Sequence, residues 1–252
     1  MKYFVEKNSI VRQIWGKSDT VLFIFAGAAA EFALNKAVDW LYFTRKLPSD
    51  PLGRLFSTVS YSKKILFAEY DEGLKIIDSI SSIHSKVEKA RGEMIPDWAY
   101  RDVLFMLIHY SIASFEVLER KLSLKEKEDV FDVFYRFGKR MNLQGLPDNF
   151  LNWLAVRKHD LEHDLVKSNY TVDLYKQYKK HLGGFRYAIL LEGQIIVVPE
   201  NVRRLLQLRK FSFLTLILPF YKLSRFLKLD GLVKSIILPP KYKEEIKAMD
   251  IV

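Results

Sequence analysis

The sequence predicts an all-α fold, organised as a single multi-helix domain. By composition, 49% of the 252 residues are apolar or aromatic, which is enough to bury a sizeable core. Gly and Pro are scarce, at 11 and 8 residues, and this disfavours a sandwich or barrel with many tight turns. No linker rich in Pro, Gly or Ser divides the chain, and no repeat of 20 to 50 residues is visible. We expect one helical domain over residues 1–208 and a basic amphipathic extension over residues 209–252.

The first half of the chain predicts four helices with apolar residues at helical spacing. Ser18 or Asp19 can cap the first helix, and its small-residue segment AGAAA lets a backbone or a flat ligand come close. Asp50 caps the second helix, with Pro51 at its first position. The fourth is apolar on most sides and is expected at the centre. The four predicted helices span residues 18–46, 51–67, 71–90 and 97–121.

The second half of the chain predicts further helices with clear start and stop signals. Ser123 and Glu126 form a capping box, and Asp148 can begin the next helix. Gly183–Gly184 ends a short helix, and the segment after it is a buried helix, with a strand as the alternative because of its Ile-Ile-Val-Val run. These helices span residues 123–141, 148–166, 171–182, 185–199, 199–208 and 211–238.

The charge pattern limits the expected partners and location. The formal net charge is +10, which favours nucleic acid or an anionic membrane surface as partner. Acidic and basic residues alternate along the chain, however, and no nucleic-acid motif is present, so no nucleic-acid partner is predicted. The absence of cysteine excludes thiolate metal sites and fits a reducing compartment. With neither a signal peptide nor an apolar run long enough to span a membrane, we expect a cytoplasmic protein.

One histidine interrupts an apolar helix seam. The seam of the predicted helix 71–90 runs through Ile77, Ile80, His84 and Val87, at spacings of three, four and three. A buried polar group costs free energy unless something satisfies it. A hydrogen-bond partner, a role in proton transfer or a metal are the alternatives for His84.

Three further histidines are weaker candidates. His109 is surrounded by apolar residues, and by itself it is best interpreted as a hydrogen-bonded core histidine, as is His84. His159 and His163 stand four residues apart with Glu162 beside them, a spacing that can hold zinc. No third ligand can be located, so a solvated helix face is the simpler interpretation of this pair.

The helix over residues 51–67 places an arginine and a hydroxyl together. Arg54 and Thr58 are one turn apart and can aim together at an anion or a bound oxygen species. The alternative is a surface arginine and a threonine that bonds its own helix backbone. No nucleophile elbow, phosphate loop, dinucleotide fingerprint or paired-carboxylate motif accompanies them.

Three blocks of the chain resemble one protein family. AGAAAEFALNKAVDW, LPSDPLGRLFSTV and SIHSKVEKARGE with the following IPDWAYRDVLFMLIHYS are similar to the MpaB-type oxygenases, which include the latex-clearing proteins. The resemblance covers roughly residues 10–208. It implies an all-helical, globin-like core that binds haem b. It also implies that His84, in the I-H-x-x-V block, is the iron ligand and that Arg54 and Thr58 lie over the haem; His109 is the alternative ligand.

The resemblance further implies an oxygenase that acts with dioxygen. A single axial histidine leaves the opposite iron position open, where Arg54 can stabilise charge and Thr58 can donate a hydrogen bond. The expected function is a haem b-dependent oxygenase acting on an apolar small molecule, by oxidative cleavage of an isoprenoid or lipid double bond. The alternatives are a haem protein with peroxidase, hydroxylase or dehydrogenase activity, and a non-enzymatic membrane-associated helical protein.

Two departures from the rubber oxygenases bear on the substrate. This chain reads Leu34-Asn35-Lys36 where those enzymes commonly carry a His-Pro pair, and it is shorter and lacks a secretion signal. We therefore expect an intracellular lipid or isoprenoid rather than extracellular polymer. Residues 209–238 are basic and apolar enough to lie on a membrane, although a helix that covers the core explains them equally. Residues 187–198 are candidates to line a substrate channel.

Overall fold

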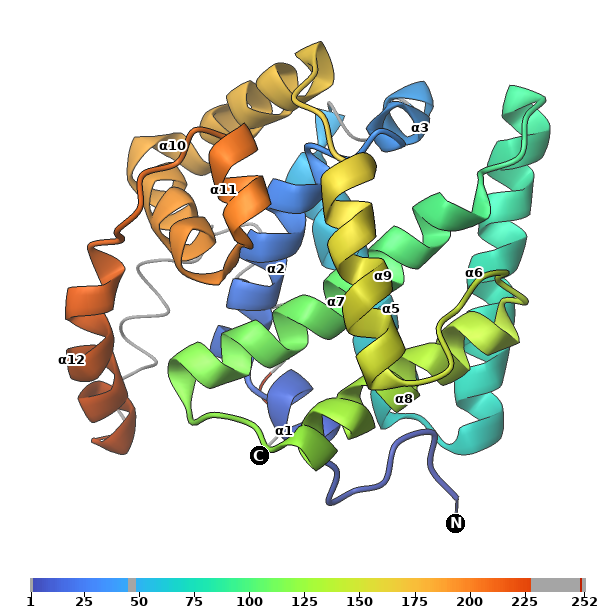
Figure 1. The fold of residues 1–252 in the computed structure, drawn as a ribbon, viewed down its shortest axis with the longest axis horizontal. Helices are drawn as coiled ribbons and strands as arrows, with labels where there is room; N and C mark the ends of the chain where they lie inside the picture. Colours follow the sequence, from blue (N-terminus) through green and yellow to red (C-terminus); the bar gives the residue numbers. More distant parts are fainter. Residues whose placement is uncertain (1, 45–48, 228–249, 251–252) are drawn as a thin grey trace.

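The computed structural model describes residues 2–44, 49–227 and 250, and within them the fold is all-α, as predicted. Two isolated bridges, Tyr3 with Glu69 and Asn35 with Leu165, are the β-type pairings of this part of the chain. Figure 1 shows one compact arrangement of helices. The described helices are α1 (Ile10–Trp15), α2 (Ser18–Phe32), α3 (Val38–Phe43), α5 (Pro51–Phe67), α6 (Tyr70–Arg91), α7 (Asp97–Leu118), α8 (Leu124–Arg140), α9 (Phe150–His163), α10 (Asn169–Val197), α11 (Glu200–Leu205) and α12 (Leu214–Phe226).

The centre of the fold is α7, as its apolar sequence predicts. It runs diagonally through the molecule and buries residues on several sides, among them Phe105, Ile108 and Tyr110. Helix α2 packs closely against it, because the small residues of AGAAA leave room. At Gly27 a Cβ atom would lie 2.2 Å from Cδ1 of Tyr110, so only glycine fits there. The small residues thus admit the aromatic side chain of Tyr110, where the prediction named another backbone or a flat ligand.

Several predicted helix starts are also confirmed. The Asp50 side chain accepts a hydrogen bond of 3.0 Å from the Gly53 amide, with Pro51 at the first position of α5. Helix α6 follows directly and ends at Gly92, whose φ of 79° is the left-handed conformation typical of a helix C-cap. The capping box of Ser123 and Glu126 is fully formed at the start of α8. These local signals place α5, α6 and α8 to within one or two residues.

The prediction of a single helix over residues 18–46 is wrong. Helix α2 ends at Phe32, and α3 begins at Val38 after a turn. The turn is held by Asn35, whose Oδ1 accepts from the Ala37 amide (2.8 Å) and whose Nδ2 donates to Asp102 Oδ2 (2.6 Å). This long-range hydrogen bond to α7 cannot be read from local sequence. The N-cap of α2 is Lys17 rather than Ser18 or Asp19.

Three smaller points concern where helices begin and end, and whether one segment is a helix or a strand. The break at Gly183 is confirmed, since its φ of 72° and ψ of 169° kink α10, and the segment after it is helical rather than a strand. The cap of α9 is Asn149 instead of Asp148, because its Oδ1 reaches the Asn152 amide at 2.9 Å. The short helix α1, capped by Ser9, was not predicted.

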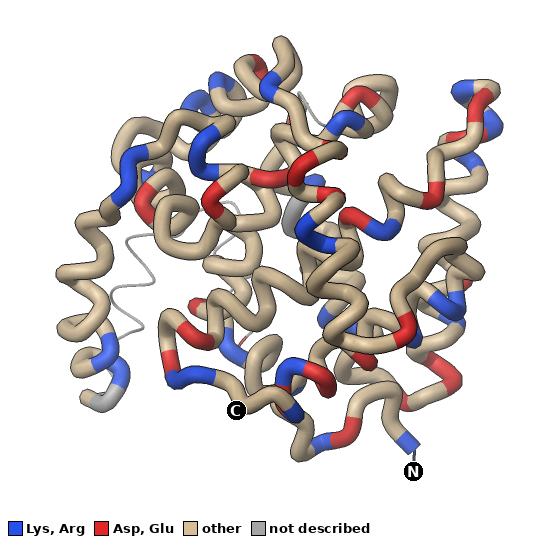
Figure 2. The backbone as a smooth tube through the Cα atoms, viewed as in Figure 1, with Lys and Arg blue, Asp and Glu red and all other residues tan. Residues whose placement is uncertain are grey.

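Helix α12 lies at the edge of the molecule (Figure 1). It covers Leu214–Phe226 of the predicted helix 211–238, and residues 228–249 of that prediction lie outside the described residues. No described helix is long and apolar enough to cross a bilayer. Figure 2 shows lysine and arginine interspersed with aspartate and glutamate along the described helices, in line with the alternation in the sequence.

The close packing at Gly27 generates a stability prediction. Gly27→Ala should lower the free energy of unfolding by roughly 1–3 kcal/mol, because the new methyl group overlaps the Tyr110 ring. Gly184→Ala is the matched control: nothing lies within 4 Å of its Cβ position, and alanine favours the helix by about 0.5–1 kcal/mol. Chemical denaturation should thus give opposite signs for the two variants, and equal effects would contradict this packing.

Candidate functional site

The apolar seam of α6 is covered at one end and only partly covered at the other. Ile77 is fully buried, whereas Ile80, His84 and Val87 are only half-buried, and Ile83 next to the seam is exposed. Described side chains therefore do not complete the apolar contact that this seam calls for. The gap in burial begins one turn before His84, the residue that breaks the apolar pattern.

No hydrogen bond from the described residues reaches the Nδ1 atom of the His84 imidazole. This atom is buried, and the ring meets Tyr100 of α7 edge-on at 5.1 Å between centroids. Burial, and after it the positive charge of Arg54, lowers the pKa of His84 to about 4, while Glu88 opposes the shift. The ring is therefore neutral at pH 7, the state in which an imidazole nitrogen can ligate a metal.

The Arg54 guanidinium is buried next to this ring. Its Nη1 donates to Ser57 Oγ (3.1 Å) and Thr58 Oγ1 (3.3 Å), both neutral hydroxyls on the same helix. Burial lowers the pKa of Arg54. A buried cation whose hydrogen bonds go to hydroxyls rather than to a carboxylate is costly unless an anion or a polarised group joins it.

Thr58 also bonds its own helix backbone, which was the alternative considered for this residue. Its hydroxyl lies 3.4 Å from the Arg54 carbonyl oxygen. Even so, Arg54, which bonds Thr58, lies close enough to His84 for its positive charge to act on the ring, where α5 and α6 pack. The spacing of one helical turn predicted that Arg54 and Thr58 lie together. Their proximity to His84 was implied only by the family resemblance.

Polar contacts hold the far end of α6 in place. Glu88 is buried, and its Oε1 accepts hydrogen bonds from Tyr100 Oη (3.1 Å) and the Ile95 amide (3.0 Å). One turn on, Arg91 bonds Asp39 at 2.8 Å and lies 3.9 Å from the centre of the Trp40 ring. These contacts tie the C-terminal half of α6 to α7 and α3, so the half-buried seam around His84 has a fixed frame.

His109 does not belong to this group. It lies nine residues beyond Tyr100 on α7, about 13.5 Å along the helix axis. Burial, followed by the charge of Arg157, lowers its pKa to about 3, while the nearby Val197 backbone opposes the shift. This geometry matches a satisfied core histidine, so His109 is not placed to share a cofactor with His84.

The pair His159 and His163 lies on an exposed face. Their rings stack with centroids 4.0 Å apart, and His163 Nδ1 lies 2.8 Å from the His159 carbonyl oxygen. Among the described residues, neither ring belongs to a group of three side chains that could share a metal ion. His159 and His163 are therefore part of a solvent-exposed helix face.

The residues around His84 fit a haem group on three counts. The imidazole is neutral and unpartnered, the adjoining seam has apolar surface left to cover, and Arg54 supplies a buried positive charge. A surface hollow of about 430 Å³ lies elsewhere, lined by Tyr3, Glu6, Lys7 and Asn8, and is not part of this group. His84 would hold the iron, with Arg54 and Thr58 beside it.

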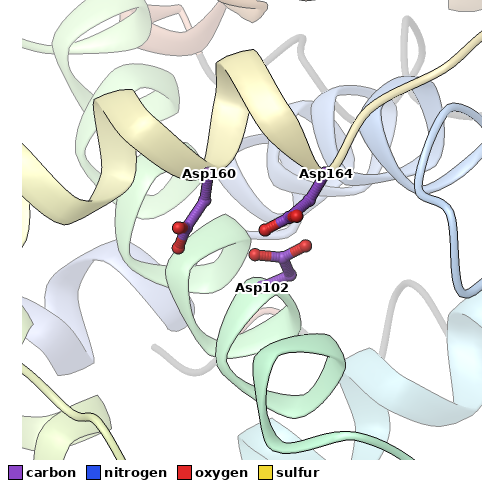
Figure 3. Close-up of side chains that lie close together, drawn as sticks. All are labelled: Asp102, Asp160 and Asp164. Atoms are coloured by element: carbon purple, nitrogen blue, oxygen red, sulfur yellow. The ribbon is translucent and has the colours of Figure 1, made fainter.

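Two buried polar clusters were missed at the level of sequence. In the first, Arg157 of α9 forms a two-pronged ion pair with Glu31 of α2, and Tyr110 donates to the same carboxylate at 2.8 Å. In the second, Asp102, Asp160 and Asp164 converge (Figure 3). The sequence did hold a signal for each cluster: Glu31 lies inside an apolar run, and Asp160 and Asp164 are four residues apart.

Comparison of the chain with models of protein families, with curated proteins and with solved structures found no match in any of the three. The resemblance to the MpaB-type oxygenases therefore stays a prediction, and the geometry at His84 is what bears on it.

The unpartnered imidazole generates a prediction about pH. In protein freed of any bound cofactor, the free energy of unfolding should fall by on the order of 2–3 kcal/mol on acidification from about pH 6.5 to about pH 4 on account of His84. The reason is that the unfolded chain takes up a proton that the folded site rejects. His84→Leu should remove this part of the pH dependence, measured by urea denaturation across the range.

The exposed His181 provides the control for that measurement. His181→Gln should leave the pH profile of unfolding as it is in the wild type. His109 contributes a slope of the same sign, so a reduced slope, not a flat profile, is expected for His84→Leu. A profile identical to that of the wild type would show that His84 is not buried in its neutral form.

Proposed function

We propose that this protein is a haem b-dependent oxygenase that acts on an apolar small molecule. The observation that supports it best is the neutral, unpartnered imidazole of His84 beside the buried guanidinium of Arg54. An iron–imidazole bond would satisfy the ring, and the macrocycle would cover the half-buried seam of α6. A single haem would thus supply both the missing partner of the His84 ring and the missing cover of the apolar seam.

The bound haem would supply oxidation chemistry with dioxygen, and the protein would supply orientation and electrostatics. His84 would hold the group from α6. Arg54 and Thr58, fixed by hydrogen bonds on α5, would present a positive charge and a hydroxyl to charge that develops during the reaction. Their effect is larger in a buried site, because water does not screen them.

The proposed substrate class rests on the resemblance to the MpaB-type oxygenases. We propose an alkene-bearing lipid or isoprenoid, cleaved at its double bond, with residues 187–198 as the lining of its channel. Tyr187 and Leu190 of this segment are half-buried against the core. Peroxidase, hydroxylase and dehydrogenase activities use the same haem and are separated from oxygenase activity by product analysis and oxygen uptake.

Haemin titration tests the cofactor. Purified protein should develop a Soret band that saturates near one haemin per chain, and His84→Ala should fail to do so at concentrations where the wild type is saturated. Circular dichroism should show the same helix content in both proteins. His109→Ala is the matched control and should bind haemin as the wild type does, because its ring lies more than two turns along α7 from the Tyr100 ring that meets His84.

Loss of the band in His109→Ala, together with its retention in His84→Ala, would move the ligand to α7 and contradict this assignment. Arg54→Met tests the chemistry separately. It should retain haem and reduce oxygen uptake with an unsaturated substrate by about 10²–10³-fold, the usual effect of removing a preorganised electrostatic group. Unchanged turnover would remove the proposed role of Arg54.

We propose as a second candidate function that α12 attaches the protein to an anionic membrane surface. An amphipathic surface helix normally buries its apolar face, but α12 buries little of it, with only Leu214 and Leu218 half-buried among its described apolar residues other than Tyr221. Polar groups bond the helix to the protein: Tyr221 donates to Asp19 at 3.1 Å, and Arg225 bonds Glu119 at 2.5 Å. The other large apolar residues of α12 and its two caps are exposed, up to 73% at Phe220: Phe213, Leu216, Ile217, Phe220, Leu223 and Leu227.

Lysines flank this apolar face, which favours a bilayer with negative headgroups over a second protein chain. Lys210 precedes α12, and Lys222 lies within it; both are exposed. With the polar side of the helix bonded to the body of the protein, the apolar side is available to enter the headgroup region. A membrane-associated enzyme would also meet an apolar substrate at its source.

Vesicle sedimentation tests this attachment. The wild type should pellet with phosphatidylcholine vesicles that contain phosphatidylglycerol, and the double variant Leu216→Ser/Phe220→Ser should not. Leu151→Ser on α9, where the leucine is equally exposed, should pellet like the wild type. Sedimentation of the double variant at the wild-type level would contradict the proposal, as would a dimer in light scattering that dissociates in the double variant.

A further inference from the structure

A second group of side chains is unsatisfied in a different way from His84. Asp102 of α7 and Asp160 of α9 are 2% and 5% exposed, and Asp164, just after α9, is half-buried. One carboxylate oxygen of each lies within 4.8 Å of those of the other two. Figure 3 shows the three side chains pointing toward one another from the two helices.

Buried oxygens in this group have no donor. Asp102 Oδ2 accepts from Asn35, but Asp102 Oδ1 has no hydrogen-bond partner. Asp160 Oδ2 has none either, and Asp160 Oδ1 has only His159 Nδ1 at 3.4 Å. Buried polar atoms are nearly always paired, so buried carboxylates that lie this close together and keep oxygens without a partner among the described residues point to a cation.

The surrounding charges do not neutralise the group. Arg157 is the nearest buried cation, and both of its Nη atoms are bonded to Glu31, itself an anion that adds to the negative field. Arg101 acts on Asp160 from the side, and its Nη1 donates to the Gln144 carbonyl oxygen. Burial, and after it repulsion from Asp164 and Asp160, raises the pKa of Asp102 to about 8.

We propose that Asp102, Asp160 and Asp164 bind one divalent cation of the size and hardness of Ca²⁺. Carboxylate oxygens are the ligands that such ions prefer, at about 2.3–2.6 Å. The three oxygens lie within 4.8 Å of one another, so one ion at this distance from each can contact all three. Ca²⁺ accepts irregular coordination more readily than Mg²⁺, which demands a near-ideal octahedron.

The bound ion would join the end of α9 to the second turn of α7. The half-buried Asp164 leaves one side toward solvent, where water can complete the coordination. Asn35 orients Asp102 and also holds the turn between α2 and α3, so the ion would stabilise that turn as well. The site is independent of the proposed haem site and of its test.

Calorimetry and thermal unfolding of the full chain test the site after treatment with EDTA and removal of the chelator. Ca²⁺ should bind one per chain and raise the melting temperature by roughly 5–10 °C at a concentration a hundred times its dissociation constant. Mn²⁺ and Mg²⁺ should bind more weakly. No heat and no shift with any of the three ions would overturn the proposal and identify a carboxylic acid–carboxylate pair instead.

Variants assign the site to these residues. Asp102→Asn should abolish the Ca²⁺-dependent shift while raising the melting temperature of the ion-free protein, because it removes repulsion. Asp164→Asn, which is less buried, gives the same test if the first variant does not fold. Asp148→Asn, at an exposed carboxylate before α9, should bind Ca²⁺ like the wild type. Equal binding by Asp164→Asn and the wild type would place the ion elsewhere and overturn the proposal.

Discussion

The buried ion pair of Glu31 and Arg157 is the constraint on which the packing of this protein depends. The two side chains are 1% and 4% exposed and bond through two oxygens and two nitrogens. Such a pair adds little net stability over apolar residues, but breaking it leaves a buried charge and typically costs about 3–5 kcal/mol. Because Tyr110 bonds the same carboxylate, α2, α7 and α9 can meet in one arrangement. That arrangement sets Asp102 opposite Asp160, and it aims Tyr100 of α7 at the α6 helix that carries His84.

Within this frame, buried polar groups divide into satisfied and unsatisfied ones. Glu31 bonds both Nη atoms of Arg157 and the Tyr110 hydroxyl, and Glu88 bonds Tyr100 and a backbone amide, so the role of these carboxylates is to fix structure. The imidazole of His84 and the carboxylate of Asp102 each keep a buried atom without a partner. Folding alone does not favour such atoms, since each costs free energy that an apolar side chain would avoid. These two groups are among several with such atoms in the described chain; they lie on different helices, and the partners proposed for them differ, iron for the neutral nitrogen and a divalent cation for the hard oxygens.

Local sequence patterns were sufficient for most of the fold. Asp50 with Pro51, the Ser123–Glu126 box and Gly183 act within a few residues, so their effects could be predicted. The turn at Asn35 could not, because the bond that stabilises it comes from Asp102, 67 residues further on. The same limit applies to the sites. His84 was conspicuous, since it broke a helical period, and the pairing of Arg54 with Thr58 was visible at i,i+4. The convergence of Asp102 with Asp160 and Asp164 depends on how α7 crosses α9, and nothing local to either helix encodes that crossing.

The central claim is that iron satisfies the His84 imidazole, and resonance Raman spectroscopy of the reduced, haemin-reconstituted protein tests it most directly. The account predicts an iron–histidine stretching band that shifts on ¹⁵N-labelling of histidine. The band should be lost in His84→Gly and return when free imidazole is added, because the added ring refills the same position on the iron. A band that persists in His84→Gly without imidazole, or wild-type protein that takes up no haem, would contradict the account.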